Sequence, residues 1–418
     1  MTKRLILAFV FLSWHLVACS NGDSGISSGL PDKPSAEEDS PGTETISEEM
    51  RVKITGEDLY ISAKLDAKTD ILYWFKKCMF NELFTFYRVG TIDNNMPTPA
   101  TLPDASPTSL LNLAYSDNIG PFNITGYGWC GGNHPYLDEV TQTALNIGYR
   151  IYIDGKEIKT DLSTLTKEIK IEVINEIMNP SKADTSSGKT LLNEILCIET
   201  VNYSIYRNNI QVLVTHEFQN ESPVTVQMYY GMQSMFDKET HTLTANGKYV
   251  DWTVQKDVST FTKKEYPSFR RFIEKSANAY QSSYLFADGL GNHEEISDDD
   301  IIFIGNSSNK TYHKIIADRE HKKGDIIHWS GVYTWFKSPV SDDDDLLCYE
   351  GVIDNKKVLF IDCKKSVDRT IQLPVDYTKK SFTIIEKSKS ITITGNKVTA
   401  KGLRIVSDGS GSCVITFD

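Results

Sequence analysis

The 418-residue sequence lacks the features of several common protein classes. Glycine and proline are sparse, at 26 and 14 residues, while tyrosine and phenylalanine together reach 38, so collagen-like, coiled-coil and wholly disordered chains are excluded. Only 44 Lys and Arg face 56 Asp and Glu, so no nucleic-acid partner is expected. No Gly-x-Ser-x-Gly elbow, His-Glu-x-x-His helix or EF-hand loop occurs, which removes common serine esterase, zinc protease and calcium-sensor assignments.

Cysteine is also scarce, and none of the seven has the Cys-x-x-Cys spacing of a zinc or thiol redox site. Apart from one near the N-terminus they are Cys78, Cys130, Cys197, Cys348, Cys363 and Cys413. In an exported protein six cysteines allow 15 disulfide pairings, between which the sequence does not choose. Buried free thiols are the alternative.

Neither a metal nor a cofactor is expected. The aspartate runs at 298–300 and 342–345 are rich enough in oxygen for Ca²⁺. They lack an ordered ligand spacing, however, so we interpret them as solvated turns.

The first segment of the chain predicts an export signal. Lys3 and Arg4 precede an apolar run that ends at Ala18 and is too short for a transmembrane helix. Its last residues, Leu-Val-Ala-Cys, resemble the lipobox of bacterial lipoproteins, in which the cysteine, here Cys19, becomes the lipidated first residue. Ser20 stands where an aspartate would indicate inner-membrane retention, so the resemblance implies the outer membrane. An ordinary secretory signal that ends in a chance cysteine is the alternative.

Residues 20–50 predict a disordered acidic tether. They contain no aromatic residue and eight acidic residues against one basic residue, so they cannot bury enough apolar surface to offset chain entropy. A flexible coil of about 30 residues has an r.m.s. reach of roughly 30 Å. Without residues 1–19 the net charge changes from −12 to −14, of which the tether holds half and residues 51–418 hold −7.

A lipid-anchored body on such a tether resembles the surface lipoproteins of Bacteroidota polysaccharide-utilisation systems. The resemblance implies a membrane contact through Cys19, a polysaccharide or glycan ligand, and other outer-membrane glycan-uptake components as partners. It also implies the cell surface rather than the periplasmic face.

The remainder of the chain predicts a mainly β fold, with an antiparallel β-sandwich or stacked-sheet body. Apolar residues alternate with polar ones over 149–153, before the turn dipeptide Asp-Gly, and again over 210–218 and 224–230. Helical spacing is found mainly at 267–284.

The polar run at 341–345 divides this region into a main domain, residues 51–340, and a small C-terminal β-module, residues 341–418. A long hairpin loop would give the same pattern.

The most unusual stretch is Gly-Tyr-Gly-Trp-Cys-Gly-Gly-Asn-His-Pro-Tyr at 126–136. Its four glycines allow the backbone to bring Trp129, Asn133, His134 and Tyr136 close to a ligand. In uronate β-elimination an amide hydrogen-bonds the carboxylate, a neutral histidine removes the C5 proton and a tyrosine protonates the leaving oxygen. The alternative is a structural loop whose glycines form tight turns.

Three further groups of residues are candidates for the site. His216 lies on the apolar face of its strand, where a hydrogen-bonded core histidine is the simpler interpretation. If that face lines a cleft, His216 and Tyr230 form an acid–base pair. Tyr229 lies on the opposite face, which is either simply solvated or a sugar-binding groove. Trp329, Tyr333 and Trp335 share one face of a strand, where they either stack on a glycan or pack in the core.

Together these features predict an extracytoplasmic lipoprotein that acts on polysaccharide. The leading hypothesis is a β-eliminating lyase with His134, His216 and Tyr230 as catalytic residues and Asn133 as the carboxylate neutraliser. The alternatives are a glycan-binding protein without activity and a structural or adhesion protein. A hydrolase with paired carboxylates, one of them Glu217, also remains open.

The Cys19→Ala variant tests the predicted anchor. Without the thiol no lipid can be attached, so we expect the protein to move from the membrane to the soluble fraction on cell fractionation. An unchanged membrane association of the variant contradicts the lipoprotein assignment.

Overall fold

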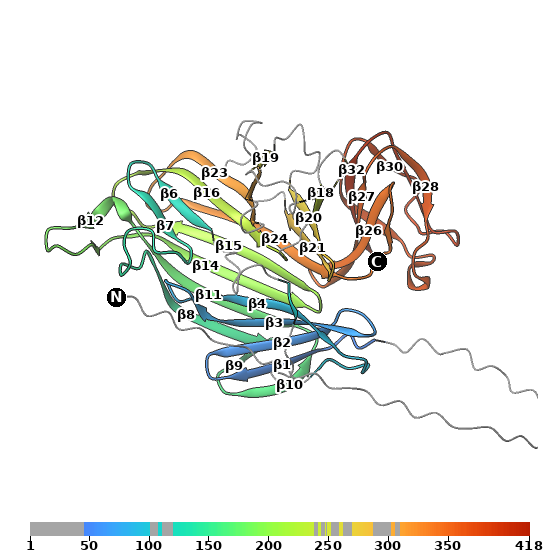
Figure 1. The fold of residues 1–418 in the computed structure, drawn as a ribbon, viewed down its shortest axis with the longest axis horizontal. Coiled ribbons are helices and arrows are strands. Elements are labelled where there is room, and N and C mark those ends of the chain that lie inside the picture. Colours follow the sequence, from blue (N-terminus) through green and yellow to red (C-terminus); the bar gives the residue numbers. More distant parts are fainter. Residues whose placement is uncertain are drawn as a thin grey trace, which may run out of the picture. The chain divides into compact units, whose positions relative to one another are not determined.

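The structure is a computed structural model that describes residues 46–100, 108–110, 120–237, 241–243, 247, 249–251, 259–261, 270–286, 302–305 and 310–418. The signal, Cys19, the tether up to residue 45 and the aspartate run at 298–300 lie outside these residues. Antiparallel sheets dominate the described part of the chain, which confirms the mainly β fold (Figure 1). No helix there has the length and hydropathy that crossing a bilayer requires.

A ten-stranded sheet forms the centre of the body (Figure 1). Its strand order is β18 (Tyr249–Asp251), β17 (His241–Leu243), β20 (Arg271–Lys275), β21 (Tyr280–Leu285), β24 (Ile326–Phe336), β15 (Asn209–Phe218), β14 (Ile195–Tyr206), β11 (Ile169–Met178), β8 (Ala144–Ile153) and β9 (Lys156–Ile158). The hairpin expected after residue 153 is confirmed, because Asp154 and Gly155 connect β8 to β9 with φ of 47° and 78°. Residues 210–218 alternate between buried and more exposed positions as predicted.

Two six-stranded sheets pack against this centre. The first has the order β10 (Leu162–Thr166), β1 (Met50–Thr55), β2 (Asp58–Lys64), β3 (Thr69–Cys78), β4 (Leu83–Asp93) and β5 (Thr108–Ser109). The second has the order β19 (Ser259–Phe261), β22 (Ile302–Gly305), β23 (Lys310–His321), β16 (Val224–Met235), β6 (Pro121–Ile124) and β7 (Gly128–Gly131).

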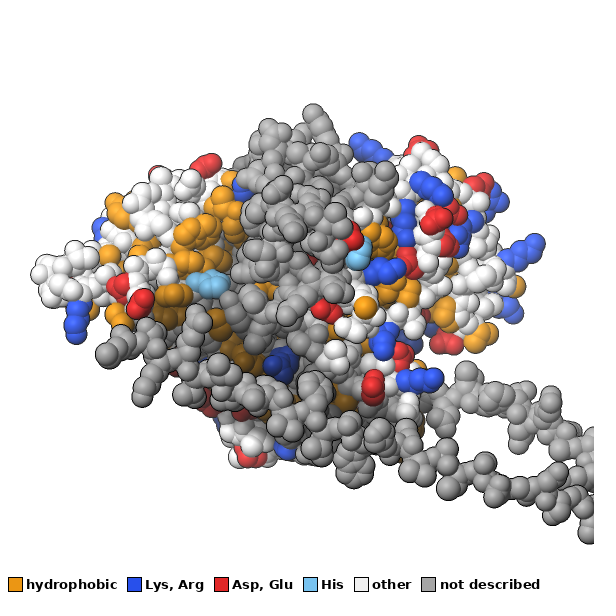
Figure 2. Space-filling model, viewed as in Figure 1, with side chains coloured by type: hydrophobic (Ala, Val, Ile, Leu, Met, Phe, Trp, Pro, Cys, Tyr) orange, Lys and Arg blue, Asp and Glu red, His pale blue; other side chains and the backbone are white. Residues whose placement is uncertain are grey.

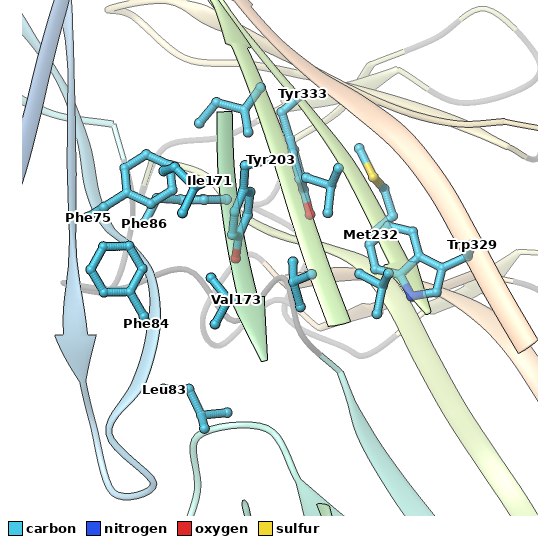
Figure 3. Packing of buried hydrophobic residues seen from close by; sticks show 14 of the residues in the cluster. Phe75, Leu83, Phe84, Phe86, Ile171, Val173, Tyr203, Met232, Trp329 and Tyr333 are labelled. Carbon is cyan, nitrogen blue, oxygen red and sulfur yellow. The ribbon is translucent and has the colours of Figure 1, made fainter. Parts of the chain in front are cut away.

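Aromatic rings fill the space between these sheets. Phe86 of the first six-stranded sheet meets Tyr203 and Tyr333 of the ten-stranded sheet at 6.4 and 5.6 Å between ring centroids (Figure 3). In the second six-stranded sheet, Phe122 meets the buried ring of His216 at 4.9 Å. The three sheets thus share one continuous hydrophobic core, as in a β-sandwich.

Residues 341–418 form two further sheets with a hydrophobic cluster of their own. One has the order β25 (Ser341–Asp342), β26 (Leu346–Ile353), β27 (Lys356–Cys363), β32 (Gly411–Phe417) and β29 (Phe382–Lys387), and the other has β28 (Val367–Ile371), β31 (Leu403–Ser407) and β30 (Ile391–Ile393). Tyr349 of β26 stacks on Phe336 of β24 at 4.3 Å, so the five-stranded sheet also packs against the ten-stranded one. The remaining elements are a small hairpin, β12 (Ala183–Asp184) with β13 (Leu191–Leu192), and 3-10 turns at Pro180–Lys182 and Val375–Tyr377.

The expected helix at 267–284 is wrong, because residues 271–285 form the hairpin of β20 and β21. Both faces of these strands are covered, so Phe272 and Ile273 are buried although they are neighbours in sequence. Strands buried on both faces lose the polar alternation that identifies a strand, and their apolar residues then fit a helical spacing by chance.

All six cysteines of the body are buried and none of these described residues is in a disulfide, which matches the alternative of buried thiols. Cys363 and Cys413 both lie in the C-terminal core. Burial raises the pKa of each of these two thiols to about 12. They therefore behave as small apolar residues near neutral pH.

Glu274 of β20 is an acidic side chain buried in the ten-stranded sheet, as Glu199 of β14 also is. A chain of hydrogen bonds leads to it, in which Trp335 donates to Gln281 at 2.8 Å, Gln281 donates to Ser234, and Ser234 donates to the Glu274 carboxyl group. Within the described part of the chain its Oε1 atom has no hydrogen-bond partner. Burial raises the pKa of Glu274 to about 8.

This raised pKa predicts that stability falls with rising pH. The unfolded chain releases the Glu274 proton near the ordinary glutamate pKa of 4.5, and the folded chain near pH 8. Between these values the folded state binds more protons, so we expect this group to lower the unfolding free energy by up to about 1.4 kcal/mol per pH unit.

Chemical denaturation at pH 5 and pH 8 measures this effect. The Glu274→Gln variant should lose this part of the pH dependence, whereas Glu217→Gln, at an exposed position of β15, should keep it. The same pH dependence in Glu274→Gln and in the wild type contradicts the assignment.

Candidate functional site

An irregularity of strand β16 decides which of its tyrosines faces outward. The pairing of β16 with β6 shifts register between Val226 and Met228, so that Gln227 is an extra residue on β16. The strict alternation expected for 224–230 is therefore wrong beyond Val226, because this bulge changes the face to which the following side chains point. As a result Tyr229 is buried in the core and Tyr230 is only half-buried.

Tyr230 belongs to a row of three aromatic rings on the outer side of the second six-stranded sheet. The Trp129 ring of β7 lies between Tyr230 and Tyr136, at 6.1 and 6.2 Å between centroids and interplanar angles of 16° and 29°. All three side chains are half-buried. We call these three residues the aromatic row. Figure 2 shows hydrophobic side chains gathered over the region where β6, β7 and β16 lie.

His134 extends the aromatic row at one end. Its ring meets the Tyr136 ring edge-on, at 5.7 Å and 71°, and His134 is also half-buried. The row therefore brings together Trp129, His134, Tyr136 and Tyr230, four of the residues that the sequence singled out. The first three come from the glycine-rich loop and the fourth from a strand about 100 positions later.

Backbone geometry explains why this loop is rich in glycine. The φ angles of its glycines are all positive, at 81°, 85°, 78° and 58° for Gly126, Gly128, Gly131 and Gly132. A second kind of constraint applies to Gly120, where an added Cβ would lie 1.6 Å from the backbone oxygen of Tyr230. Only glycine lets the two chain segments approach so closely.

An aspartate fixes the segment that follows Tyr136. Its side chain, that of Asp138, accepts hydrogen bonds from the backbone N–H groups of Val140 and Thr141 at 2.9 and 2.6 Å. The bond from Val140 and the Thr141 hydroxyl group hold the pKa of Asp138 at about 2. This loop end is therefore structured next to the aromatic row.

Asn133 lies beneath the surface of the same loop. It is 1% exposed, and among the described residues neither its Oδ1 nor its Nδ2 atom has a hydrogen-bond partner. A buried amide without partners costs about 1–3 kcal/mol, which is unusual in a folded protein. The side-chain amide of Asn133, one residue before His134, therefore has a donor and an acceptor that no described residue satisfies.

The other predicted histidine, His216, is a core residue. Its Nε2 atom lies 2.8 Å from Glu199 Oε2, and both side chains are fully buried. Asn175 donates to Glu199 and Asn146 donates to Asn175, each at 2.9 Å, so four strands in succession contribute to one polar ladder. This is the hydrogen-bonded core histidine that the sequence offered as the simpler interpretation.

The core also contains the second predicted aromatic group. Trp329, Tyr333 and Trp335 are 1%, 1% and 0% exposed, in agreement with the interpretation as core packing. Trp329 donates to the Tyr229 hydroxyl group at 2.7 Å, and the Tyr229 ring meets the ring of His216 at 5.0 Å. These five residues are therefore enclosed, and none can contact a sugar in this structure.

Sequence reasoning missed another surface aromatic group, on the first six-stranded sheet. The rings of Tyr60 and Trp74 stack at 5.3 Å, and Tyr87 meets Trp74 edge-on at 4.8 Å. Lys76 lies over the Trp74 ring, with Nζ at 4.5 Å from its centroid. Trp74 and Lys76 are two positions apart in the sequence, which indicates that they lie on the same face of their strand. Their aromatic partners, Tyr60 and Tyr87, come from other strands, so the sequence alone does not place them there.

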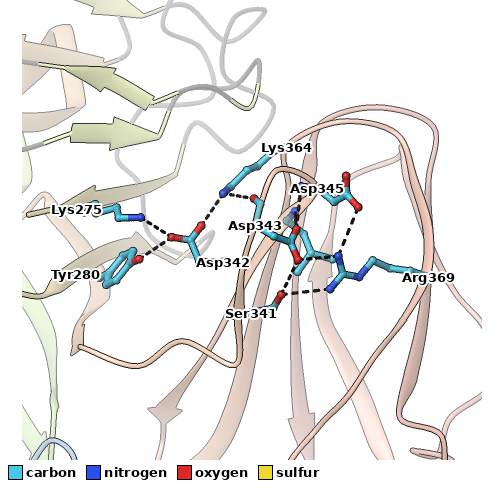
Figure 4. Close-up of polar contacts among 9 residues, drawn as sticks. Lys275, Tyr280, Ser341, Asp342, Asp343, Asp345, Lys364 and Arg369 are labelled. Atoms are coloured by element: carbon cyan, nitrogen blue, oxygen red, sulfur yellow. Dashed lines mark hydrogen bonds and ion pairs between the residues drawn. The ribbon is translucent and has the colours of Figure 1, made fainter.

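Three of the four aspartates at 342–345 pair with basic side chains (Figure 4). Asp342 binds Lys275 at 2.7 Å and Lys364 at 2.6 Å, so it links β20 to the C-terminal sheets. Asp343 and Asp345 pair with Arg369 and Lys365, both at 2.8 Å. Within the described ranges no group of three or more His, Cys, Asp or Glu side chains is arranged to hold a metal ion.

No protein-family model and no curated protein matches this chain. Similar solved structures include the galactosidase domain of an α-galactosidase–sucrose kinase, with a TM-score of 0.37, 11% identity, and 68% of this chain and 41% of that chain covered. A GH36 α-galactosidase from Geobacillus stearothermophilus gives 0.38 and 7%, with 69% and 41% covered. A polysaccharide lyase gives 0.28 and 9%, with 82% and 45% covered.

This chain thus spans less than half the length of each of these carbohydrate-active proteins. Likeness at these TM-scores and identities establishes neither a shared fold nor a shared function.

Proposed function

We propose that the protein binds a glycan across the aromatic row, from a position at the cell surface where the lipid on Cys19 anchors it. The observation that carries this proposal is the set of three half-buried, nearly parallel rings of Tyr136, Trp129 and Tyr230 on one outer face. Aromatic faces offer large apolar area in a fixed geometry, and the C–H faces of sugars complement them.

The shape and charge of the row indicate the kind of glycan. Its two intervals of about 6 Å form an extended surface, which suits a chain of sugars better than a single one. None of its three side chains, nor that of His134, carries a fixed positive charge, and the body has a net charge of −7. Both facts favour an uncharged polysaccharide.

The Trp129→Ala variant tests the binding surface. Loss of the central ring should weaken glycan binding by about 1 kcal/mol or more, roughly fivefold, in calorimetric titration with a panel of soluble polysaccharides. Trp74→Ala is the matched control, because Trp74 is also half-buried and lies on the first six-stranded sheet.

Equal affinity of wild type and Trp129→Ala for every glycan that binds contradicts the proposal. If no glycan binds the wild type either, the structural or adhesion role becomes the better interpretation.

Uronate β-elimination is the second candidate function, and a specific observation favours it. His134 and Tyr136 are in ring contact, and the unpaired amide of Asn133 precedes them directly. In this proposal the His134 imidazole removes the C5 proton, the Tyr136 hydroxyl group protonates the leaving oxygen, and the Asn133 amide hydrogen-bonds the substrate carboxylate. Asn133 is buried, so the glycine-flanked loop must open for this contact.

Incubation with uronate-containing polysaccharides tests this second function through the ultraviolet absorbance of unsaturated products. We expect His134→Ala to abolish any such activity, because it removes the base. His328→Ala, at another half-buried histidine on β24, should retain it. Full activity of His134→Ala, or no product from any substrate, rules out this lyase mechanism.

A further inference from the structure

A small pocket lies at the seam between the ten-stranded sheet and the C-terminal five-stranded sheet. Its volume is about 100 Å³. We call it the seam pocket, and its polar lining comes from the turn between β14 and β15, the residues after β24, and strands β26 and β27: Arg207, Asn208, Lys337, Ser338, Glu350 and Lys357.

Positive charge predominates in the seam pocket, although the body as a whole is acidic. Three basic side chains, Arg207, Lys337 and Lys357, face one acidic side chain, Glu350. Glu350 accepts a hydrogen bond from Tyr377, and Lys357 pairs with Glu48 at 3.2 Å outside the lining. With both Glu350 and Glu48 counted against the three bases, the pocket keeps a net charge of one positive unit.

The charges of two of these bases are not neutralised. In the part of the chain that the structure describes, neither Arg207 nor Lys337 has a carboxylate within 4.0 Å. Lys337 donates to the Thr69 hydroxyl group at 3.1 Å, and Arg207 makes only a long contact to the Lys64 backbone oxygen at 3.4 Å.

Arg207 lies in the turn of the β14–β15 hairpin, and its φ angle of 50° is the left-handed conformation that such turns require. This turn places Arg207 in the lining of the seam pocket. An anion in the pocket would compensate the charge of its guanidinium group.

We propose that the seam pocket binds a small oxyanion, namely a sulfate, phosphate or carboxylate group. The planar guanidinium group of Arg207 is suited to hold two oxygens of such a group, while Lys337 and Lys357 act as point charges. This inference goes beyond the proposed function and does not depend on the aromatic row, from which the pocket shares no residue.

The size of the pocket limits the ligand. A cavity needs roughly 10–15 Å³ of this volume for one water molecule, so the seam pocket has room for an oxyanion and several waters. It is well below the ~300 Å³ at which pockets for whole organic ligands begin. The anion is therefore either free in solution or the substituent of a larger molecule that stays outside.

Calorimetric titration of the full chain with sodium sulfate and sodium phosphate, at an ionic strength kept constant with sodium chloride, tests the proposal. We expect saturable binding that Lys337→Gln and Arg207→Lys each weaken about tenfold or more, since each loses a charge-assisted hydrogen bond. Lys356→Gln is the matched control, because Lys356 is exposed, neighbours Lys357 and does not line the pocket.

A sulfated oligosaccharide and its desulfated form distinguish the two sources of the anion. Tighter binding of the sulfated form than of inorganic sulfate, with the same sensitivity to Lys337→Gln, shows that a glycan carries the group. Equal affinity for the sulfated oligosaccharide and for inorganic sulfate shows that the free ion suffices. Thermal unfolding verifies that each variant is folded.

The proposal is overturned if neither anion binds the wild type saturably. It is also overturned if folded Lys337→Gln and Arg207→Lys bind with the affinity of the wild type. Trp129→Ala should keep its anion affinity, which separates a failure here from a failure of the proposed glycan binding.

Discussion

The burial of large aromatic rings between one wide sheet and two narrower ones is the constraint on which the rest of the structure depends. Tyr203, Tyr333 and Phe86 occupy this layer, and they fix the distance and register at which the sheets meet. Tryptophan and tyrosine residues used in this way are unavailable to a ligand. In the described part of the chain, a ligand can therefore contact only aromatic residues that lie outside this layer, and strand β16 decides which of its two tyrosines is among them.

Binding groups lie on the outside of this core at two separate places with opposite chemistry. The aromatic row is apolar and carries no fixed positive charge, whereas the seam pocket is small and holds Arg207 and Lys337, which have no carboxylate partner in the described part of the chain. In the two proposals, the row suits the faces of uncharged sugars and the pocket suits an anionic group. The two surfaces share no residue, so a substitution can alter one without the other.

The sequence predicted the fold class and many strands, because alternating burial leaves a period of two in strands such as β15. It failed where that period is absent or interrupted. The β20–β21 hairpin is covered on both faces and resembles a helix in its spacing, and the bulge of β16 before Met228 exchanges the expected positions of Tyr229 and Tyr230. Two members of the row, Trp129 and Tyr136, and the adjacent His134 were identified, since the glycine-rich loop keeps them together in sequence. The seam pocket could not be found, because Arg207, Lys337 and Lys357 meet only through tertiary packing.

The edges of the ten-stranded sheet have a consequence for how copies of the protein behave next to one another. In the described part of the chain its outermost strands are β18 and β9, each of three residues, and β9 begins with Lys156 and Glu157. Long, flat edges invite strand pairing between molecules, and short charged ones prevent it. The edges of this sheet therefore offer little length for pairing with a strand of another copy.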